Sequence, residues 1–218
     1  QMERTAAAGL HRAFAPKLLV LDINGLLLER LRSSEKHGVS RPHDAKVKGN
    51  YVYFRPHLAS FFEFCLDRFA VGVWSSMMRH NVEGVMKRAL PDYQDRLAFF
   101  WDGSQATDTG KKHPTNPNKR VVVKELRKLW EFPPVRGLYG PCNTLLIDDD
   151  PYKARQNPAH TAVHPPTYSA LKDDDELLAP GGALREWLEG LSTSADVVGY
   201  VAKSPLPGAM HAGGGGAG

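Results

Sequence analysis

The chain has 218 residues, of which 42% are hydrophobic and 24% are charged, and its formal net charge is +4. This length and composition suit a single ordinary globular domain with a substantial buried core. No apolar run approaches the roughly 20 residues that cross a membrane, and the mild positive charge fits an anionic substrate without demanding nucleic acid. Only two cysteines occur, and neither has a metal-binding spacing. This usage indicates a reducing compartment and not a disulfide framework, so we expect an intracellular location, nucleus or cytoplasm.

The two ends of the chain carry weak structural signals. Residues 1–16 are rich in alanine and are expected to form an N-terminal extension. Residues 204–218 include the run GGGGAG, which is typical of a flexible tail. Residues 17–203 contain no internal repeat and no obvious linker, so we expect them to form one domain.

Short apolar runs alternate with helical patterns along this domain. Runs bounded by polar or turn residues predict four buried strands: Leu18–Leu21, Ala70–Trp74, Leu97–Trp101 and Thr144–Ile147. Apolar residues at helical spacing predict helices that contain Leu58–Leu66, Val82–Leu90, Leu126–Trp130 and Leu184–Leu191. This alternation predicts an α/β fold with a mostly parallel sheet and helices on both faces. Ligands of such sheets bind beyond the carboxyl ends of the strands.

Two polar connections interrupt the alternation. The segment Leu31–Asn50, with Tyr51–Arg55 after it as a short strand, predicts a loop or a small hairpin over the end of the sheet. The segment Asp102–Arg120 predicts a solvated loop, although its basic residues also suit contact with an acidic partner. Neither connection is long enough to form a large cap domain.

Two of the predicted strands end in carboxylates. The run KLLVLDINGLL places Asp22 at the end of a strand, before a turn that contains Gly25, where backbone amides can cradle a ligand. The run TLLIDDDP ends in three carboxylates, among them Asp148 and Asp149. Crowded carboxylates repel one another, and hard oxygen ligands favour Mg²⁺. Each aspartate alone also suits a cap or a turn, but the two groups together predict a metal site.

Other polar side chains complete a candidate phosphate site. Ser75 and Ser76 follow the strand Ala70–Trp74 and place hydroxyl and backbone donors at another strand end. Ser75 also suits the cap of the next helix, and a helix N-terminus attracts anions. Lys124 lies in VVVKELRKLW, where the sequence by itself suggests a solvated helix lysine.

The order of these motifs resembles the haloacid dehalogenase superfamily, in which a strand with Asp, a strand with Ser or Thr, a Lys and a strand with Asp-Asp follow one another. The stretches YVYFRPH, VGVWSS, VVKEL and LLIDDDP are similar to the small C-terminal-domain phosphatases, the NLI-interacting-factor-like family, over residues 17–201. The resemblance implies a single Rossmann-like domain without a large cap.

The resemblance also implies catalytic roles. Asp22 would attack the phosphoryl group, Ser75 with Ser76 would bind its oxygens, and Lys124 would neutralise its charge. Covalent catalysis of this kind divides the hydrolysis into two displacements, in which metal and lysine stabilise the charge on the phosphoryl oxygens.

A set of oxygen ligands for Mg²⁺ is implied in the same way. Asp149 would contact the metal with Asp148 as its support, while Asp22 and the backbone carbonyl of Asn24 would complete the coordination.

Asn24 departs from the family pattern, which has a second Asp at this position as the general acid. Asparagine cannot exchange a proton at neutral pH, and general acid–base catalysis contributes roughly 10²–10⁴-fold. We therefore expect an Mg²⁺-dependent phosphatase that acts through an aspartyl-phosphate on a phosphorylated protein or peptide. The alternative is a catalytically weak pseudophosphatase that binds phosphopeptide or protein. A small-molecule phosphatase is less favoured, because small substrates usually require enclosure.

Overall fold

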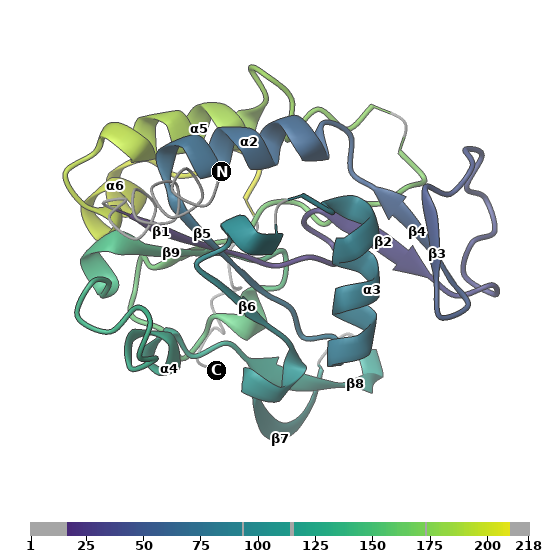
Figure 1. Cartoon of the computed structure of the whole chain (residues 1–218), viewed down its shortest axis with the longest axis horizontal. Helices are drawn as coiled ribbons and strands as arrows, with labels where there is room; N and C mark the ends of the chain where they lie inside the picture. The colour runs from purple at the N-terminus through teal and green to yellow at the C-terminus, as the bar shows by residue number, and fades with distance from the viewer. Residues whose placement is uncertain (1–16, 93, 114–115, 173, 210–218) are drawn as a thin grey trace, which may run out of the picture.

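The computed structural model describes residues 17–92, 94–113, 116–172 and 174–209 (Figure 1). At its centre lies a five-stranded sheet with the strand order β10-β9-β1-β5-β6, in which every paired strand is parallel. Its strands are β1 (Leu18–Leu21), β5 (Ala70–Trp74), β6 (Phe99–Trp101), β9 (Thr144–Ile147) and β10 (Ala162–Val163). The four predicted strands are confirmed, with β6 beginning at Phe99. The two-residue β10 is too short to give a sequence signal.

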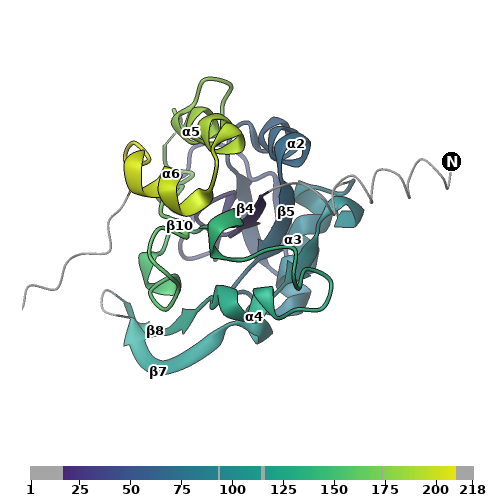
Figure 2. The same cartoon turned by 90° about the vertical axis from the view of Figure 1, so that its left-hand side faces the viewer.

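Helices cover both faces of this sheet, as predicted. They are α2 (Leu58–Arg68), α3 (Arg79–Ala89), α4 (Leu126–Trp130), α5 (Ala183–Thr193) and α6 (Val197–Lys203). Alternate side chains of β1 point to opposite faces, because Leu19 and Leu21 share one buried cluster with α2 and α5 while Leu18 and Val20 share another with α4. Both views show α2 and α5 side by side above the sheet and α4 below it (Figures 1 and 2). The sheet is therefore buried on both faces, which explains its nearly continuous apolar strands.

Short 3₁₀ helices join several of these elements. They are η1 (Gln94–Arg96), η2 (Gly103–Gln105), η3 (Pro141–Asn143) and η4 (Pro151–Lys153).

A small antiparallel sheet with the strand order β2-β4-β3 extends from the side of the domain (Figure 1). Its strands are β2 (Leu28–Leu31), β3 (Ala45–Val47) and β4 (Asn50–Phe54). The predicted hairpin is confirmed as β3–β4, whose turn has positive φ at Lys48 (49°) and Gly49 (80°), as in a type I′ turn. Strand β2 was not predicted, because the sequence LERL is short and half polar.

The expectation of a loop over Asp102–Arg120 is wrong for the backbone. Strands β7 (Thr107–His113) and β8 (Asn116–Val123) pair there as an antiparallel hairpin, which lies below α4 in Figure 2. Its register shifts between Asp108 and Lys112, and it lacks the alternation of apolar side chains that marks a half-buried strand. The solvated character is confirmed, since Lys111, Lys112 and Arg120 are exposed.

The packed structure continues beyond the last helix. The side chain of Leu206 is buried in the core, and the indole Nε1 of Trp187 donates to the Ser204 carbonyl oxygen at 2.7 Å. The predicted extension over residues 1–16 and the GGGGAG run lie outside the described residues. Among the residues that the structure describes, no helix has the length and apolar character that a membrane span requires.

Candidate active site

The parallel register of β1 and β9 brings two of the predicted aspartates together. Leu21 pairs with Ile147, so Asp22 and Asp148 leave neighbouring strands at the same edge of the sheet. The backbone N–H of Asp22 donates to the Ile147 carbonyl oxygen at 3.0 Å, which continues the ladder into the site. Both aspartates are buried, with 1% and 0% of their surface exposed. Two negative charges in such surroundings require close cationic partners.

Two lysines supply these partners. Lys124 Nζ lies 2.6 Å from Asp22 Oδ1 and 2.5 Å from Asp148 Oδ2. Lys153 Nζ lies 3.0 Å from Asp22 Oδ2 and 2.9 Å from Asp148 Oδ1. The four side chains form a closed ring in which each carboxylate accepts from both ammonium groups. Lys124 is fully buried, so it is not the solvated helix lysine that its sequence context suggests.

The opposite charges of this ring favour the ionised forms of Lys153 and Asp148. Burial opposes the charged form of Lys153, but the carboxylates of Asp148, Asp22 and Asp149 raise its pKa well above the ordinary value. Burial likewise opposes ionisation of Asp148, but Lys124 and Lys153 together lower the pKa of this carboxyl. For both groups, the opposite charges therefore have a larger effect on the pKa than burial has.

Backbone contacts fix the two lysines next to each other. The N–H of Lys124 donates to the Lys153 carbonyl oxygen at 2.7 Å, and Asn157 Nδ2 donates to the Lys124 carbonyl oxygen at 2.9 Å. Asp150 caps the N-terminus of the short helix η4, because its Oδ1 accepts from the Tyr152 N–H at 3.1 Å. This helix turns the chain so that Lys153 lies beside the strand end. Sequence reasoning missed Lys153. The Asp-Pro pair before it indicates a tight turn, but the direction of a long side chain after that turn cannot be predicted from spacing.

Asp149 has an incompletely paired carboxylate. Its Oδ2 accepts from Thr167 Oγ1 at 2.9 Å, whereas its buried Oδ1 has no hydrogen-bond partner in the described part of the chain and lies 4.0 Å from Lys153 Nζ. Burial, together with the charges of Asp22 and Asp148, raises the pKa of Asp149 to about 6, although Lys153 acts in the opposite direction. An unpaired buried oxygen is unfavourable, and a bound cation would satisfy it.

The three aspartates fit a divalent metal. Carboxylate oxygens of Asp22, Asp148 and Asp149 lie within 4.8 Å of one another. An all-carboxylate donor set with one unsatisfied oxygen suits a hard cation such as Mg²⁺. The contact of the Asn24 carbonyl with the metal stays a prediction.

Gly25 allows Asp149 to approach the turn after β1. Its φ is +93°, and a Cβ atom built on it would lie 2.2 Å from Asp149 Oδ2. Its N–H donates to the Leu28 carbonyl oxygen at 2.8 Å, and its own carbonyl accepts from the Tyr168 N–H at 2.7 Å. These hydrogen bonds hold the turn between the two acidic motifs. Glycine is required at this position, because φ is positive and because a larger side chain would clash with Asp149.

We expect Gly25→Ala to lower the free energy of unfolding by roughly 2–4 kcal/mol, because positive-φ strain and a clash with the Asp149 carboxylate add together. The matched control is Gly49→Ala, where φ is +80° but nothing lies within 4 Å of the added Cβ atom. That variant should lose only the strain, about 1–2 kcal/mol. Urea unfolding measures both values, and equal losses would show that the contact with Asp149 is unimportant.

The remaining predicted residues lie around this cluster. Asn24 is exposed, and its Oδ1 accepts from the Arg30 N–H at 3.0 Å. Ser75 is buried, and its Oγ accepts from the Met77 N–H at 3.2 Å, ahead of α3. Ser76 is exposed. Among the hydrogen bonds of the described residues, none joins Asn24 or either serine to the lysine–aspartate ring.

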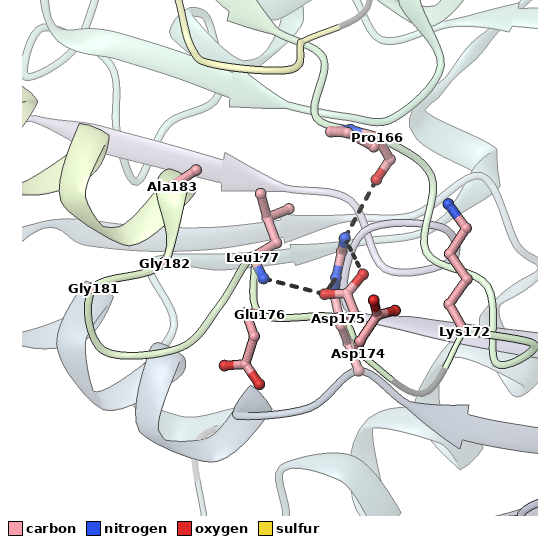
Figure 3. Close-up of a pocket in the computed structure, with 10 residues that line it drawn as sticks. Pro166, Lys172, Asp174, Asp175, Glu176, Leu177, Gly181, Gly182 and Ala183 are labelled. Atoms are coloured by element: carbon pink, nitrogen blue, oxygen red, sulfur yellow. Dashed lines mark hydrogen bonds and ion pairs between the residues drawn. The ribbon is translucent and has the colours of Figure 1, made fainter.

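A buried arginine connects the site to the C-terminal half of the chain. Arg55 is 2% exposed, and its guanidinium donates to the Leu26 carbonyl oxygen at 2.9 Å and to both carboxylate oxygens of Asp175 at 2.8 Å. The Pro166 carbonyl oxygen lies 3.4 Å from Nη2 (Figure 3). Sequence reasoning missed this role of Arg55, because its partner Asp175 lies 120 residues away.

A cavity of about 480 Å³ lies beside this arginine, and Lys172, Asp174 and Glu176 are among the residues around it (Figure 3). Asp22, Asp148 and Asp149 do not line the cavity. It is therefore separate from the candidate active site.

A parallel sheet with a carboxylate after β1, a lysine before α4 and two aspartates after β9 defines a haloacid dehalogenase-type phosphatase fold. Residues 17–198 match the family described as NLI interacting factor-like phosphatase, and the chain belongs to this family. The predicted family and fold class are thereby confirmed.

The relatives of the chain agree with this assignment. An uncharacterized FCP1 homology domain-containing protein of Schizosaccharomyces pombe is 28% identical over 202 residues, which cover 87% of this chain and 77% of that protein. The solved structure of Fcp1, an essential RNA polymerase II CTD phosphatase, has a TM-score of 0.51 at 15% identity. The match covers 94% of this chain but only 55% of the solved one, so the chain spans about half the length of that structure. At this identity the likeness shows the fold alone.

Proposed function

We propose that this chain is an Mg²⁺-dependent phosphatase that forms an aspartyl-phosphate at Asp22 and acts on a phosphorylated protein segment. The observation that carries the proposal is the ring of Asp22, Lys124, Asp148 and Lys153 beside the unsatisfied oxygen of Asp149. A carboxylate nucleophile, cations for phosphoryl oxygens and ligands for a metal thus lie at one edge of the sheet. A purely structural cluster has no need for all three.

The first step is attack of an Asp22 carboxylate oxygen on phosphorus, with cleavage of the bond between phosphorus and the leaving oxygen. Each Asp22 oxygen accepts one hydrogen bond from a lysine, and each keeps a further lone pair with which it could attack. The two ammonium groups beside Asp22 would stabilise the charge of the phosphoryl oxygens. Ser75 would bind another phosphoryl oxygen.

The second step is attack of water on the acyl phosphate, which releases inorganic phosphate and restores the Asp22 carboxylate. Mg²⁺ held by Asp22 and Asp149, with Asp148 as support, would neutralise charge on the transferred group. Asn24 neither protonates the leaving group nor deprotonates this water. Both steps therefore depend on solvent for their proton transfers, which favours good leaving groups and a slow second step.

A protein segment is the substrate class that best suits the shape of the chain. The additions to the central fold that the structure describes are the β2-β4-β3 sheet and the β7–β8 hairpin, and neither is a large cap. The similar solved structure is of a phosphatase of the RNA polymerase II CTD, which is a phosphorylated protein segment. Exposed Lys111, Lys112 and Arg120 on the hairpin suit an acidic chain. Both cysteines are free, consistent with the proposed nuclear or cytoplasmic location.

The second candidate function is a pseudophosphatase that binds a phosphorylated or acidic partner with little turnover. Asn24 favours it, because the side chain at the general-acid position accepts a hydrogen bond from the Arg30 backbone and has no exchangeable acid proton. The two functions differ in whether Asp22 acquires a phosphoryl group.

Restoring the acid with Asn24→Asp tests the proposal. We expect hydrolysis of an aryl phosphate in Mg²⁺ to rise by roughly 10–100-fold, at or below the lower end of the usual range, because an aryl leaving group needs little protonation. The measurement compares both proteins with Mg²⁺ and with a chelator. Asn24 precedes glycine, a sequence prone to deamidation, so the mass of its peptide must be verified.

Metal-dependent turnover by the unmodified chain supports the enzyme. Activity in Asn24→Asp alone would show that the site is intact but inactive without the general acid, and would support the pseudophosphatase. Absence of turnover in both proteins, with folding verified by circular dichroism, would overturn the proposal.

A further inference from the structure

We infer that Lys153 is a built-in cation of the metal site: its ammonium group competes with Mg²⁺ for the carboxylates and at the same time strengthens the binding of a phosphoryl oxyanion. The part that concerns the oxyanion rests on the proposed function. The competition with Mg²⁺ depends only on the contacts of the folded chain.

The position of Lys153 carries the inference. Its Nζ lies 3.0 Å from Asp22, 2.9 Å from Asp148 and 4.0 Å from Asp149, measured to the nearest carboxylate oxygen. These are the three residues whose oxygens gather as a candidate metal site. Lys124 differs, since its ion pairs with the described residues are those with Asp22 and Asp148 alone. One ammonium group therefore approaches every carboxylate that a divalent ion would use.

Lys153 is also fixed in this place. It is 5% exposed, and its carbonyl oxygen accepts from the N–H of Lys124. The short helix η4 that carries it starts at Pro151, directly after the acidic motif. A lysine on so short a connection cannot move far from the carboxylates, even when its ammonium group yields one of them to another ligand.

The charge of the cluster explains the two opposite effects. Asp22, Asp148 and Asp149 carry three negative charges, and the two lysines carry two positive charges. Without the charge of Lys153 the cluster would be more negative, so it would hold a divalent cation more tightly and a phosphoryl dianion more weakly. Even at the dielectric constant of water, a unit charge roughly 4 Å from a divalent ion changes its affinity by about tenfold or more.

Lys153→Gln tests this inference without reference to turnover. We expect its dissociation constant for Mg²⁺, measured by calorimetry, to fall by about tenfold, and that for inorganic phosphate to rise by about tenfold. Lys153→Arg keeps the charge and should stay closer to the unmodified chain in both titrations. Lys87→Gln makes the same chemical change on the exposed side of α3 and should alter neither affinity.

A measurement on the unmodified chain does not depend on the folding of a variant. Saturating Mg²⁺ should increase the labelling of Lys153 by an amine reagent several-fold, read by peptide mass spectrometry, while labelling of Lys87 stays constant. Opposite changes in the two affinities, together with Mg²⁺-dependent labelling of Lys153, support the inference. Unchanged affinities in a folded Lys153→Gln variant, or labelling that ignores Mg²⁺, would overturn it. Aryl phosphate hydrolysis by the unmodified chain separately shows whether the proposed function itself fails.

Discussion

Replacing Asp22 by asparagine is expected to lower the Mg²⁺-dependent hydrolysis of an aryl phosphate by roughly 10⁴–10⁶-fold, the usual result of removing a covalent nucleophile. Asparagine has nearly the same shape but cannot supply the attacking oxygen. Lys124 and Lys153 neutralise the charges of Asp22 and Asp148, and the substitution removes the first of these charges. The loss should therefore appear in kcat, because no step of the reaction can begin.

The control for this variant is Asp67→Asn, which makes the same change at an exposed position of α2. It should keep full activity. Circular dichroism and the unfolding midpoint must show that Asp22→Asn is folded, since the change leaves two buried lysines with fewer carboxylate partners. A folded Asp22→Asn variant that retains a tenth or more of the activity would exclude Asp22 as the nucleophile.

The second large effect concerns stability. We expect Arg55→Met to lower the free energy of unfolding by about 3–5 kcal/mol, because removal of one member of a buried ion pair leaves the other charge without compensation. The side chains of Arg55 and Asp175 are 2% and 13% exposed. The same variant removes the donor to the Leu26 carbonyl oxygen at the turn that follows Asp22. Activity should therefore fall together with stability.

Urea unfolding measures this loss, and Arg68→Met is the matched control. Arg68 pairs with Glu189 on the surface, where the two side chains are 33% and 50% exposed. Such a pair contributes about 0–1 kcal/mol, so the control should lie near the unmodified chain. Similar losses in the two variants would show that the Arg55–Asp175 pair does not hold the site together.

The sequence was sufficient to predict most of the elements that lie in the core, although β10 and α6 were missed. Runs such as Leu18–Leu21 and Thr144–Ile147 are apolar because both faces of their strands are covered, and this signal is local. The proximity of Asp22 to Asp148 also followed from the sequence, because parallel strands end at the same edge of the sheet. The metal-site hypothesis thus needed only the identity and the direction of two strands.

Features that depend on distant partners or on exposed backbone could not be predicted in this way. The hairpin β7–β8 is polar and solvated, so it gives no pattern of burial. The pairing of Arg55 with Asp175 joins two segments far apart in the sequence. Lys153 comes two residues after a proline, in a charged stretch whose composition is typical of an exposed segment. Only the three-dimensional path of η4 shows that its side chain is buried.

We propose that Asp22 accepts the phosphoryl group, and detection of the aspartyl-phosphate is the most direct test of this role. Because the chain lacks an acid–base residue at Asn24, water should attack the acyl phosphate slowly and the intermediate should accumulate. We would mix the protein with an aryl phosphate and Mg²⁺, quench it in acid, reduce the acyl phosphate with borohydride and map the peptides by mass spectrometry. We expect reduction of Asp22 to homoserine, with a smaller fraction in Asn24→Asp. Turnover without modification of Asp22, or with the phosphoryl group on another residue, would contradict it.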